Sequence, residues 1–475
     1  MTQPPYSIEP SILTVINAKT AWHYRIIPVS VTQNTIEILA EETMANAGLS
    51  DELEILLNKK ISLQKQRSEI IQELLEKYYQ KELEDSRLQN IYYTGEADGF
   101  LNHLISEARH LNSSDIHIES FEEIGRVRIR IDGMLIQRYL LEKKQYPSLI
   151  NKIKIIANLD IAEKRLPQDG RIFFEHQHHK FDIRVSVLPT LHGEKCVLRL
   201  LNNDATKIDI QLVGFSETNL QHYLEGIRRP NGILLISGPT GSGKTTTLYA
   251  TLKLLNKSTR NILTIEDPIE YTLEGINQVQ LKENIGLTFS AALRTFLRQD
   301  PDIIMLGEIR DVETANMAIR AALTGHLVLS TIHTNSAWGI ISRLIDMGIP
   351  PFLLASTINT AVAQRLVRLL CTDCKQKKPF TNSLYPNKFT PYAIIQEHFI
   401  AKGCPNCFDT GYKGRKAVYE VIPIDHELSA HIKNGNLNVE NILHEKGIKS
   451  LSENSFELFE QGVTSLEEIY SLLMN

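Results

Sequence analysis

The sequence predicts an α/β protein whose core is a parallel sheet, preceded by a small α/β domain and a small α+β domain. Beyond residue 214, short apolar runs of strand length alternate with helical segments, which is typical of a parallel sheet with helices on both faces. Between residues 99 and 213, polar and apolar residues alternate as in half-buried antiparallel strands. Before residue 82, β-rich runs and amphipathic helices form a separate small unit.

The first domain is expected at residues 1–82. Two β-rich runs, TAWHYRIIPVSV and NTIEILAEE, predict strands. Apolar residues at helical spacing predict helices in DELEILLNKK and SEIIQELLEKYYQ, the second with Ser68 as its N-cap. A charged stretch without an apolar face follows, so we expect a linker at residues 83–98.

The second domain is expected at residues 99–213. Strands are predicted in SDIHIES and RVRIRIDGMLIQRYL, and the dipeptide Asp132-Gly133 favours a hairpin turn within the latter. A helix around YPSLINKIKIIANL and the strands KFDIRVSVLP and EKCVLRLL complete an α+β domain. Cys196 alternates with apolar neighbours, so we expect it in the core.

The core domain is expected at residues 214–365. Its predicted strands are GILLIS, NILTIED, DIIMLGE and HLVLSTI, and its helices include TTTLYATLKLLNK and VETANMAIRAALTG. Residues 426–475 have an amphipathic pattern and are predicted to be helical.

The composition, 42% hydrophobic and 23% charged, excludes collagen-like and disordered classes. The formal net charge of -5 gives no whole-chain reason to expect nucleic acid or an anionic membrane surface. No apolar run reaches the length of a membrane span, and the first residues lack a signal-peptide pattern. We therefore expect a soluble cytoplasmic protein that meets a membrane only through partners.

The segment GPTGSGKT matches the P-loop pattern, and it has the required strand before it and helix after it. The glycines let backbone N–H groups surround phosphate oxygens, Lys244 reaches the β and γ phosphates, and the Thr245 hydroxyl ligates Mg²⁺. The alternative is a fortuitous glycine-rich turn. We expect ATP and Mg²⁺ here, with the nucleotide held by Gly238, Pro239, Thr240, Gly241, Ser242, Gly243, Lys244, Thr245 and Thr246.

Two acidic segments offer the groups that hydrolysis needs. NILTIEDPIEY runs from an apolar strand into Glu266, Asp267 and Glu270, and DPDIIMLGEIRD delivers Glu308 just past a strand end. Ligand sites in open α/β sheets lie at the carboxyl ends of strands, so both segments are expected near the phosphates. The alternative for each segment alone is a solvated strand end.

Two CxxC pairs, Cys371 with Cys374 and Cys404 with Cys407, predict a module at residues 366–425. Four thiolates suit tetrahedral Zn²⁺, and a site closed by four cysteines is structural. The stretch between the pairs is longer than in a usual zinc ribbon, so it must loop out. Buried free cysteines or a redox pair are the alternatives.

Four segments in this order resemble the secretion ATPases of the GspE/PilB type. They are the P-loop GPTGSGKTTTLY, an Asp box TIEDPIEY, a Walker B box LRQDPDIIMLGEIRD and a His box GHLVLSTIHTN. LPQDGR and DIRVSVLPT look like that family's second N-terminal domain. The resemblance spans about residues 99–425 and implies a PAS-like second domain, a RecA-like core and a tetracysteine module.

The resemblance also implies roles for matching residues. Glu308 looks like the Walker B glutamate that helps to hold Mg²⁺ and the water. Glu270 looks like the general base, with Glu266 as the second choice. His326 and His333 look like the His-box pair near the phosphates, with a capping or packing role as the alternative.

Four arginines match arginine positions of the family that this sequence resembles. Such arginines can stabilise transition-state charge, some of them from a neighbouring subunit. Arg171 and Arg184 belong to the second domain, and Arg294 and Arg298 to the core. For each arginine alone, a surface ion pair is the alternative. Completion of a site in trans would require assembly into a ring.

The family resemblance implies a homo-hexamer that hydrolyses ATP to drive pseudopilin assembly in type II secretion. It would attach to the inner membrane through a membrane-anchored docking protein, bound by the first domain, and a polytopic platform protein. A type IV pilus extension ATPase is the alternative. A nucleic-acid motor is more remote, because no basic and aromatic binding module is visible. The two acidic boxes argue against an adaptor that binds ATP without turnover.

Overall fold

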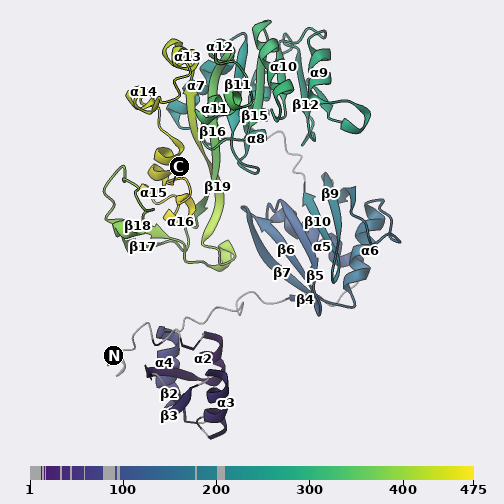
Figure 1. Ribbon diagram of the computed structural model, residues 1–475. Coiled ribbons are helices and arrows are strands. Elements are labelled where there is room, and N and C mark those ends of the chain that lie inside the picture. Colours follow the sequence, from purple (N-terminus) through teal and green to yellow (C-terminus); the bar gives the residue numbers. More distant parts are fainter. Residues whose placement is uncertain are drawn as a thin grey trace. The chain divides into compact units, whose positions relative to one another are not determined.

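The computed structural model describes residues 12, 15–16, 18–32, 35–42, 45, 47–57, 59–78, 91–93, 97–176, 179–200 and 209–474 (Figure 1). The chain divides into two compact units, one of residues 1–93 with 138–140 and one of residues 94–137 with 141–475. In the described ranges, no helix is both long enough and apolar enough to cross a membrane.

The first unit contains a three-stranded sheet, β1 (Ile26–Val31), β2 (Thr35–Glu41) and β3 (Lys60–Gln66), and the helices α2 (Ala18–Tyr24), α3 (Ala47–Leu57) and α4 (Ser68–Tyr78). The pair β1–β2 is antiparallel and the pair β2–β3 is parallel. Thr20–Tyr24 were expected to begin a strand but belong to α2, because buried Ala21 packs a helix on the core and overrides local propensity. The mostly polar β3 was not expected.

Most of the expected linker, residues 83–98, lies outside the described residues. Its described part includes β4 (Ile91–Tyr93) and the start of α5 (Ala97–His110). A short strand therefore interrupts the segment that its charge pattern indicated to be a connection.

A seven-stranded sheet follows, in the order β4-β7-β6-β5-β10-β9-β8. Its remaining elements are β5 (Asp115–Ser120), β6 (Ile124–Ile131), β7 (Met134–Glu142), α6 (Tyr146–Ile156), β8 (Gln168–His176), β9 (His179–Thr190) and β10 (Gly193–Leu200). Asp132 and Gly133 have φ values of 49° and 87°, which suit the tight hairpin turn expected there. Cys196 is fully buried in β10, as expected.

The core sheet has the order β13-β12-β14-β15-β11-β16-β19, and its described pairs are parallel except β16 with β19 (Figure 1). The strands are β11 (Gly232–Ser237), β12 (Ile262–Glu266), β13 (Asn277–Gln280), β14 (Ile303–Leu306), β15 (Leu327–Ile332), β16 (Ile358–Leu370) and β19 (Tyr412–Pro423). The predicted α/β fold with a parallel core is confirmed.

Helices cover both faces of this sheet. The helices are α7 (Glu217–Arg228), α8 (Lys244–Leu255), α9 (Phe289–Phe296), α10 (Val312–Leu323), α11 (Gly339–Asp346), α12 (Pro351–Thr357), α13 (His426–Lys433), α14 (Glu440–Glu445), α15 (Leu451–Glu460) and α16 (Leu466–Ile469). Leu234 and Ile236 of β11 pack with α7 and α8, whereas Leu235 packs with the cluster that includes α9, α10 and the C-terminal helices. The continuous apolar runs in the sequence follow from this two-sided burial.

The strand β16 continues past residue 365, where the core was expected to end. The cysteine-containing segment therefore leaves from the ends of two core strands, β16 and β19. It contains the small hairpin of β17 (Gln376–Pro379) and β18 (Glu397–Ile400).

We expect Gly226→Ala in α7 to lower the thermal unfolding midpoint, although alanine favours helix by about 1 kcal/mol over glycine. A Cβ at this position would lie 2.1 Å from Oγ1 of the buried Thr360 in β16. Overpacking of this kind costs about 1–3 kcal/mol, so the clash outweighs the propensity gain. Circular dichroism can follow unfolding, with the exposed Gln221→Ala of the same helix as the control. An unchanged or higher midpoint for Gly226→Ala would contradict this packing.

Candidate functional site

The loop between β11 and α8 has a shape that only glycine permits at three positions. Gly238, Gly241 and Gly243 have φ values of 153°, 81° and 87°. A Cβ on Gly238 would lie 2.5 Å from the Gln364 carbonyl oxygen, and one on Gly243 would lie 2.9 Å from Gln364 Nε2. The loop is thus a backbone cradle that ends at the N-terminus of α8, where free N–H groups favour an anion.

Lys244 is the first residue of α8, and its ammonium group bends back over the loop. Its Nζ donates hydrogen bonds to the carbonyl oxygens of Gly238 at 2.8 Å and Pro239 at 3.0 Å. Burial lowers the pKa of Lys244, and nearby Arg365 lowers it further, while Glu308 opposes both. The residues that follow, Thr245 and Thr246, are exposed on the first turn of the helix, so the hydroxyl of Thr245 is accessible as an oxygen ligand for Mg²⁺.

Glu308, the expected Walker B carboxylate, lies at the same edge of the sheet as this loop. Glu308 follows β14, His333 follows β15, and these strands are parallel to β11 and next to one another. His333 Nε2 lies 3.2 Å from Glu308 Oε2, and Arg310 pairs with the other carboxylate oxygen. Burial raises the pKa of Glu308, but Arg310 and His333 outweigh it, so the pKa lies below its usual value. The group is therefore ionised at neutral pH.

The Asp box contains two glutamates with different surroundings. Glu266 is buried at the end of β12 and accepts hydrogen bonds from the Tyr249 hydroxyl, from Thr264 Oγ1 at 2.6 Å and from Gln278 Nε2 at 3.1 Å. Glu270 is partly exposed, and its Oε2 lies 3.6 Å from Arg184 Nη1. The carboxylate of Glu266 is thus saturated by hydrogen bonds, whereas that of Glu270 remains accessible.

The four expected arginines fall into two groups. Arg184 also donates to the Ile269 carbonyl at 2.8 Å, and together with Arg171 it lines a cavity of about 800 Å³ that includes Asp267. Arg294 and Arg298 are exposed; Arg294 pairs with Glu313, and Arg298 Nη1 donates to the Arg294 carbonyl at 3.0 Å. Within the described residues, no hydrogen bond or ion pair joins either of the latter two arginines to the glycine loop of the same chain.

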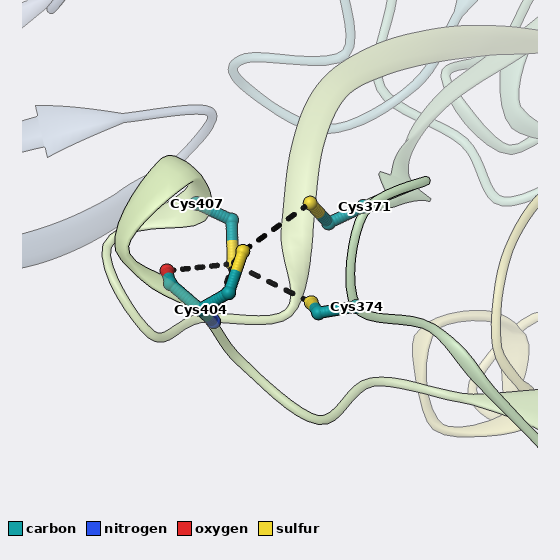
Figure 2. Close-up of side chains that lie close together, drawn as sticks. All are labelled: Cys371, Cys374, Cys404 and Cys407. Atoms are coloured by element: carbon teal, nitrogen blue, oxygen red, sulfur yellow. Dashed lines mark hydrogen bonds between the residues drawn. The ribbon is translucent and has the colours of Figure 1, made fainter.

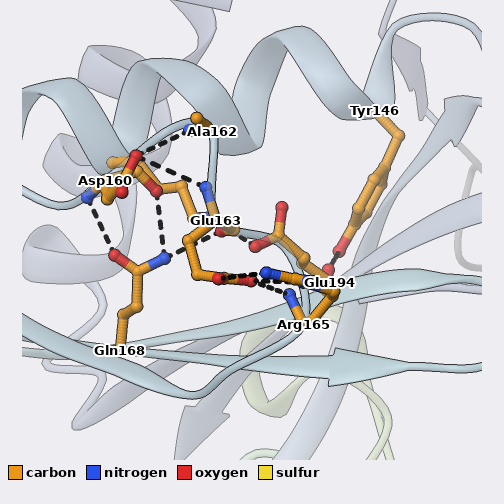
Figure 3. Close-up of polar contacts among 8 residues, drawn as sticks. Tyr146, Asp160, Ala162, Glu163, Arg165, Gln168 and Glu194 are labelled. Carbon is orange, nitrogen blue, oxygen red and sulfur yellow. Dashed lines mark hydrogen bonds and ion pairs between the residues drawn. The ribbon is translucent and has the colours of Figure 1, made fainter.

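The turn before Arg171 is held by a polar network (Figure 3). Gln168 Nε2 donates to the carbonyls of Asp160 and Glu163, each at 3.0 Å. Lys154, fully buried, donates to the Glu163 carbonyl at 2.7 Å and pairs with Glu194 at 2.5 Å. Gln168, the first residue of β8, and Lys154 therefore fix the loop that precedes the strand bearing Arg171.

The two histidines of the His box lie at opposite ends of β15. His333 reaches Glu308, but His326 precedes the strand, and six residues of strand separate the two ends by about 20 Å. His326 Nδ1 contacts the Ala321 carbonyl at 2.8 Å and Thr324 Oγ1 at 3.1 Å. The structure does not bring His326 to the loop edge, and its contacts are those of a residue that caps α10.

A second cavity, of about 360 Å³, adjoins the first turn of α8. Gly243, Thr246, Thr247 and Gln364 form its side next to the loop, and Leu212, Val213 and Leu366 add apolar surface. Its combination of apolar and polar walls suits a nucleoside beside the phosphate cradle.

The four cysteines of the two CxxC pairs converge, as expected (Figure 2). All four Sγ atoms lie within 4.8 Å of one another. The measured separations are 3.9 Å for Cys371–Cys404, 3.8 Å for Cys374–Cys407 and 3.6 Å for Cys404–Cys407. Zn–S bonds of about 2.3 Å in a tetrahedron place sulfurs about 3.8 Å apart, so the donor set fits Zn²⁺.

Sequence reasoning missed several residues that organise this site. Arg310 was not singled out, although its position two residues after Glu308 in the Walker B box could have indicated a partner for that carboxylate. Tyr249 and Gln278, which saturate Glu266, had no local signal, because both come from other elements of the fold.

A glycine cradle at a parallel strand end, with carboxylates at neighbouring strand ends, is the arrangement of P-loop ATPases. The chain belongs to the type II/IV secretion system protein family, whose model matches residues 95–471. It is an ATP-hydrolysing enzyme. The predicted resemblance to GspE/PilB-type ATPases is confirmed.

Three relatives support this membership. Type II secretion system protein E of Pseudomonas aeruginosa is 48% identical over 372 residues, covering 78% of this chain and 74% of that protein. Type II secretion system ATPase E of Vibrio cholerae is 45% identical over 376 residues, with the same shares covered. The type IV pilus assembly ATPase PilB of Myxococcus xanthus is 40% identical over 500 residues, covering 98% of this chain and 87% of PilB.

Two solved structures share the fold. The pilus retraction motor PilT with bound ADP has 26% identity and a TM-score of 0.53, with 78% of this chain and 95% of PilT covered. The ATPase DotB of Legionella pneumophila has 22% identity and a TM-score of 0.61, with 79% of this chain and 95% of DotB covered. These likenesses confirm the predicted RecA-like core.

We expect Cys404→Ser to remove bound zinc and to unfold the segment between β16 and β19 locally. Metal binding and folding are one equilibrium in such a module, so the loss of one thiolate weakens both. Elemental analysis of the purified chain measures the metal, and hydrogen exchange measures protection at residues 371–411. Cys196→Ser, in the other sheet, is the control and should retain the metal. Full zinc occupancy in Cys404→Ser would contradict the four-cysteine site.

Proposed function

We propose that this chain is the ATPase that drives pseudopilin fibre assembly in a type II secretion machine. The observation that carries the proposal is the convergence of the glycine loop, Glu308 and His333 at one sheet edge. Family membership makes a secretion or pilus machine the context in which ATP is used. Relatives from type II machines support the choice of machine.

In the proposed site, the loop and Lys244 would bind the phosphates, and Thr245 and Glu308 would hold Mg²⁺, which would offset the charge of the triphosphate. Glu270 is the proposed general base, because its carboxylate is accessible and that of Glu266 is not. Glu266 instead anchors the Asp box through Tyr249, whose hydroxyl also accepts from the Glu270 N–H at 3.3 Å. The nucleoside would occupy the 360 Å³ cavity beside the loop.

The arginines complete the proposed site. Arg184 pairs with Glu270, so closure of the second domain on the core would couple its position to the chemistry. Arg294 and Arg298 face solvent in this chain, which suits a role at the site of a neighbouring subunit in a ring. This exposure supports a ring of subunits, and the family resemblance leads us to propose a homo-hexamer. Sequential closures would then move a membrane platform protein that lifts pilin-like subunits.

A type IV pilus assembly ATPase is the second candidate, and one observation favours it. The alignment with PilB covers 98% of this chain, whereas the alignments with the two type II relatives cover 78%. The first unit would dock on a cytoplasmic membrane-anchored partner in either machine. Deletion of the gene separates the candidates: loss of secreted protein without loss of pili supports the first, and loss of surface pili supports the second.

We expect Glu308→Gln to retain nucleotide binding and to lower ATP turnover by about 100-fold or more, because the neutral amide no longer holds Mg²⁺ and water. A fluorescent nucleotide measures binding, and phosphate release measures turnover. Glu274→Gln, at an exposed site beyond the Asp box, is the control and should turn over normally. Normal hydrolysis by Glu308→Gln would disprove this assignment.

Mixing two inactive variants tests the assembly. If Arg294 acts on the nucleotide of a neighbour, equal amounts of Arg294→Ala and Glu308→Gln should restore activity at up to about a quarter of the sites, where both native residues meet. If Arg294 acts within its own chain, no such site forms. ATPase assays of the separate and mixed proteins distinguish these outcomes, and no recovery on mixing rejects the trans role.

A further inference from the structure

The segment His333–Trp338, here called the relay segment, follows β15 and has contacts on two sides. On one side, His333 meets Glu308 at the phosphate edge. The Ser336 carbonyl also accepts from Ser237 Oγ at 3.3 Å, and Ser237 is the last residue before the glycine loop. Any shift of the relay segment therefore changes the alignment of His333 with Glu308.

Arg365 connects this segment to the glycine loop. Its Nη2 donates to the carbonyls of Asn335 at 3.0 Å and Thr334 at 3.5 Å. Its Nη1 donates to the Gln364 carbonyl at 3.0 Å and lies 3.1 Å from where a Cβ of Gly238 would stand. One half-buried guanidinium thus packs on the loop and holds the relay segment at the same time.

Glu420 holds the opposite side of the relay segment. This carboxylate is buried on β19, and its two oxygens accept from the Ala337 N–H at 3.2 Å and from the Leu451 N–H at 3.4 Å. Leu451 is the first residue of α15. The charged groups that face Glu420 are Arg365 from β16 and Glu453 from α15.

Trp338 adds a second link to the C-terminal helices. Its indole is buried, and Nε1 donates to the Leu437 carbonyl, between α13 and α14, at 2.9 Å. The relay segment therefore contacts the phosphate edge through His333 and Ser336, and the C-terminal layer through Ala337 and Trp338.

We propose that Arg365 and Glu420 are positioning residues that make the alignment of His333 with Glu308 depend on the C-terminal helices. We call Arg365 and Glu420 the clamp. If the buried Glu420 carboxylate loses one of its two donors, a polar group is left unsatisfied. The clamp therefore has two distinct arrangements of different energy and no stable arrangement between them. Nucleotide bound on the glycine loop would move Arg365, and the relay segment would carry this change to α13–α16. The proposal rests on the role proposed above for Glu308.

The first test is Glu420→Gln in the full-length chain. A glutamine side chain has a single acceptor oxygen, so the N–H of Ala337 or of Leu451 loses its partner. We expect kcat to fall about tenfold with KM changed less than twofold, because substrate binding is retained and alignment is lost. Glu457→Gln, which removes a partly exposed carboxylate from α15, is the control and should keep both constants. An unchanged kcat in Glu420→Gln, or an equal loss in Glu457→Gln, overturns the proposal.

The pH dependence of kcat distinguishes a positioning role of Glu420 from a purely structural one. Burial raises the pKa of Glu420 to about 7. Above this pH the ionised carboxylate can accept both N–H groups, and below it one oxygen carries a proton. We expect kcat to fall as the pH drops through about 7, with this component missing in Glu420→Gln. Identical pH profiles for the two proteins would count against the clamp.

The second test uses Trp338 as a reporter. The chain has two tryptophans, so Trp22→Phe leaves Trp338 as the single emitter. We expect a nonhydrolysable ATP analogue with Mg²⁺ to shift its emission, and Glu420→Gln to abolish the shift while the analogue still binds. If Glu420→Gln does not fold, Arg365→Lys, which keeps the charge but loses the fork, should abolish the shift instead. A retained shift of the Trp338 emission in these variants refutes the relay.

Glu308→Gln should keep the emission shift. A failure of the proposed catalytic role of Glu308 is therefore seen separately, as normal ATP turnover in that variant.

Discussion

The parallel pairing of β14, β15 and β11 is the constraint on which the site depends. Adjacent strands lie about 4.8 Å apart, so the ends of these three strands fall within about 10 Å of one another. Because the strands run in one direction, the glycine loop, Glu308 and His333 all follow a strand and meet at one edge. His326 precedes its strand and therefore lies at the other edge, where it caps a helix. Two histidines seven residues apart in one motif thus have different surroundings.

The two glutamates of the Asp box differ in how many hydrogen bonds their carboxylates accept, although the sequence alone does not distinguish them. Glu266 and Glu270 are four residues apart, and both follow the same apolar run. Burial at the strand end forces Glu266 to be satisfied internally, because an unpaired buried carboxylate is costly. Three side chains from separate elements meet this need. Glu270 is past the strand end, where water and Arg184 reach it. The buried carboxylate positions the segment, and the accessible one is available for chemistry.

Much of this fold was predictable because its signals are local. The runs GILLIS and HLVLSTI are buried on both faces and are therefore mostly apolar, and the glycine loop has a fixed spacing. The prediction was wrong for Thr20–Tyr24 and missed β3, because a small sheet with an exposed strand has a weak pattern. In the site, Glu308 could be found from its motif. The partners of Glu266 come from α8, β12 and β13, and the clamp formed by Arg365 and Glu420 joins β16 to β19. No single local pattern encodes either arrangement.

The two long strands β16 and β19 connect these observations. Gln364 and Arg365 of β16 shape the glycine loop, and Glu420 lies on the neighbouring β19. Cys371 directly follows β16, and the N–H of Gly411, directly before β19, donates to Cys407 Sγ at 3.2 Å. The four-cysteine site therefore ties together the far ends of the same strand pair that carries the clamp. A structural metal there would resist separation of β16 from β19, because its binding energy is lost when the ends part. A closed site without an open coordination position is suited to that purpose, since rigidity of the strand pair, not chemistry at the metal, is what the phosphate edge requires.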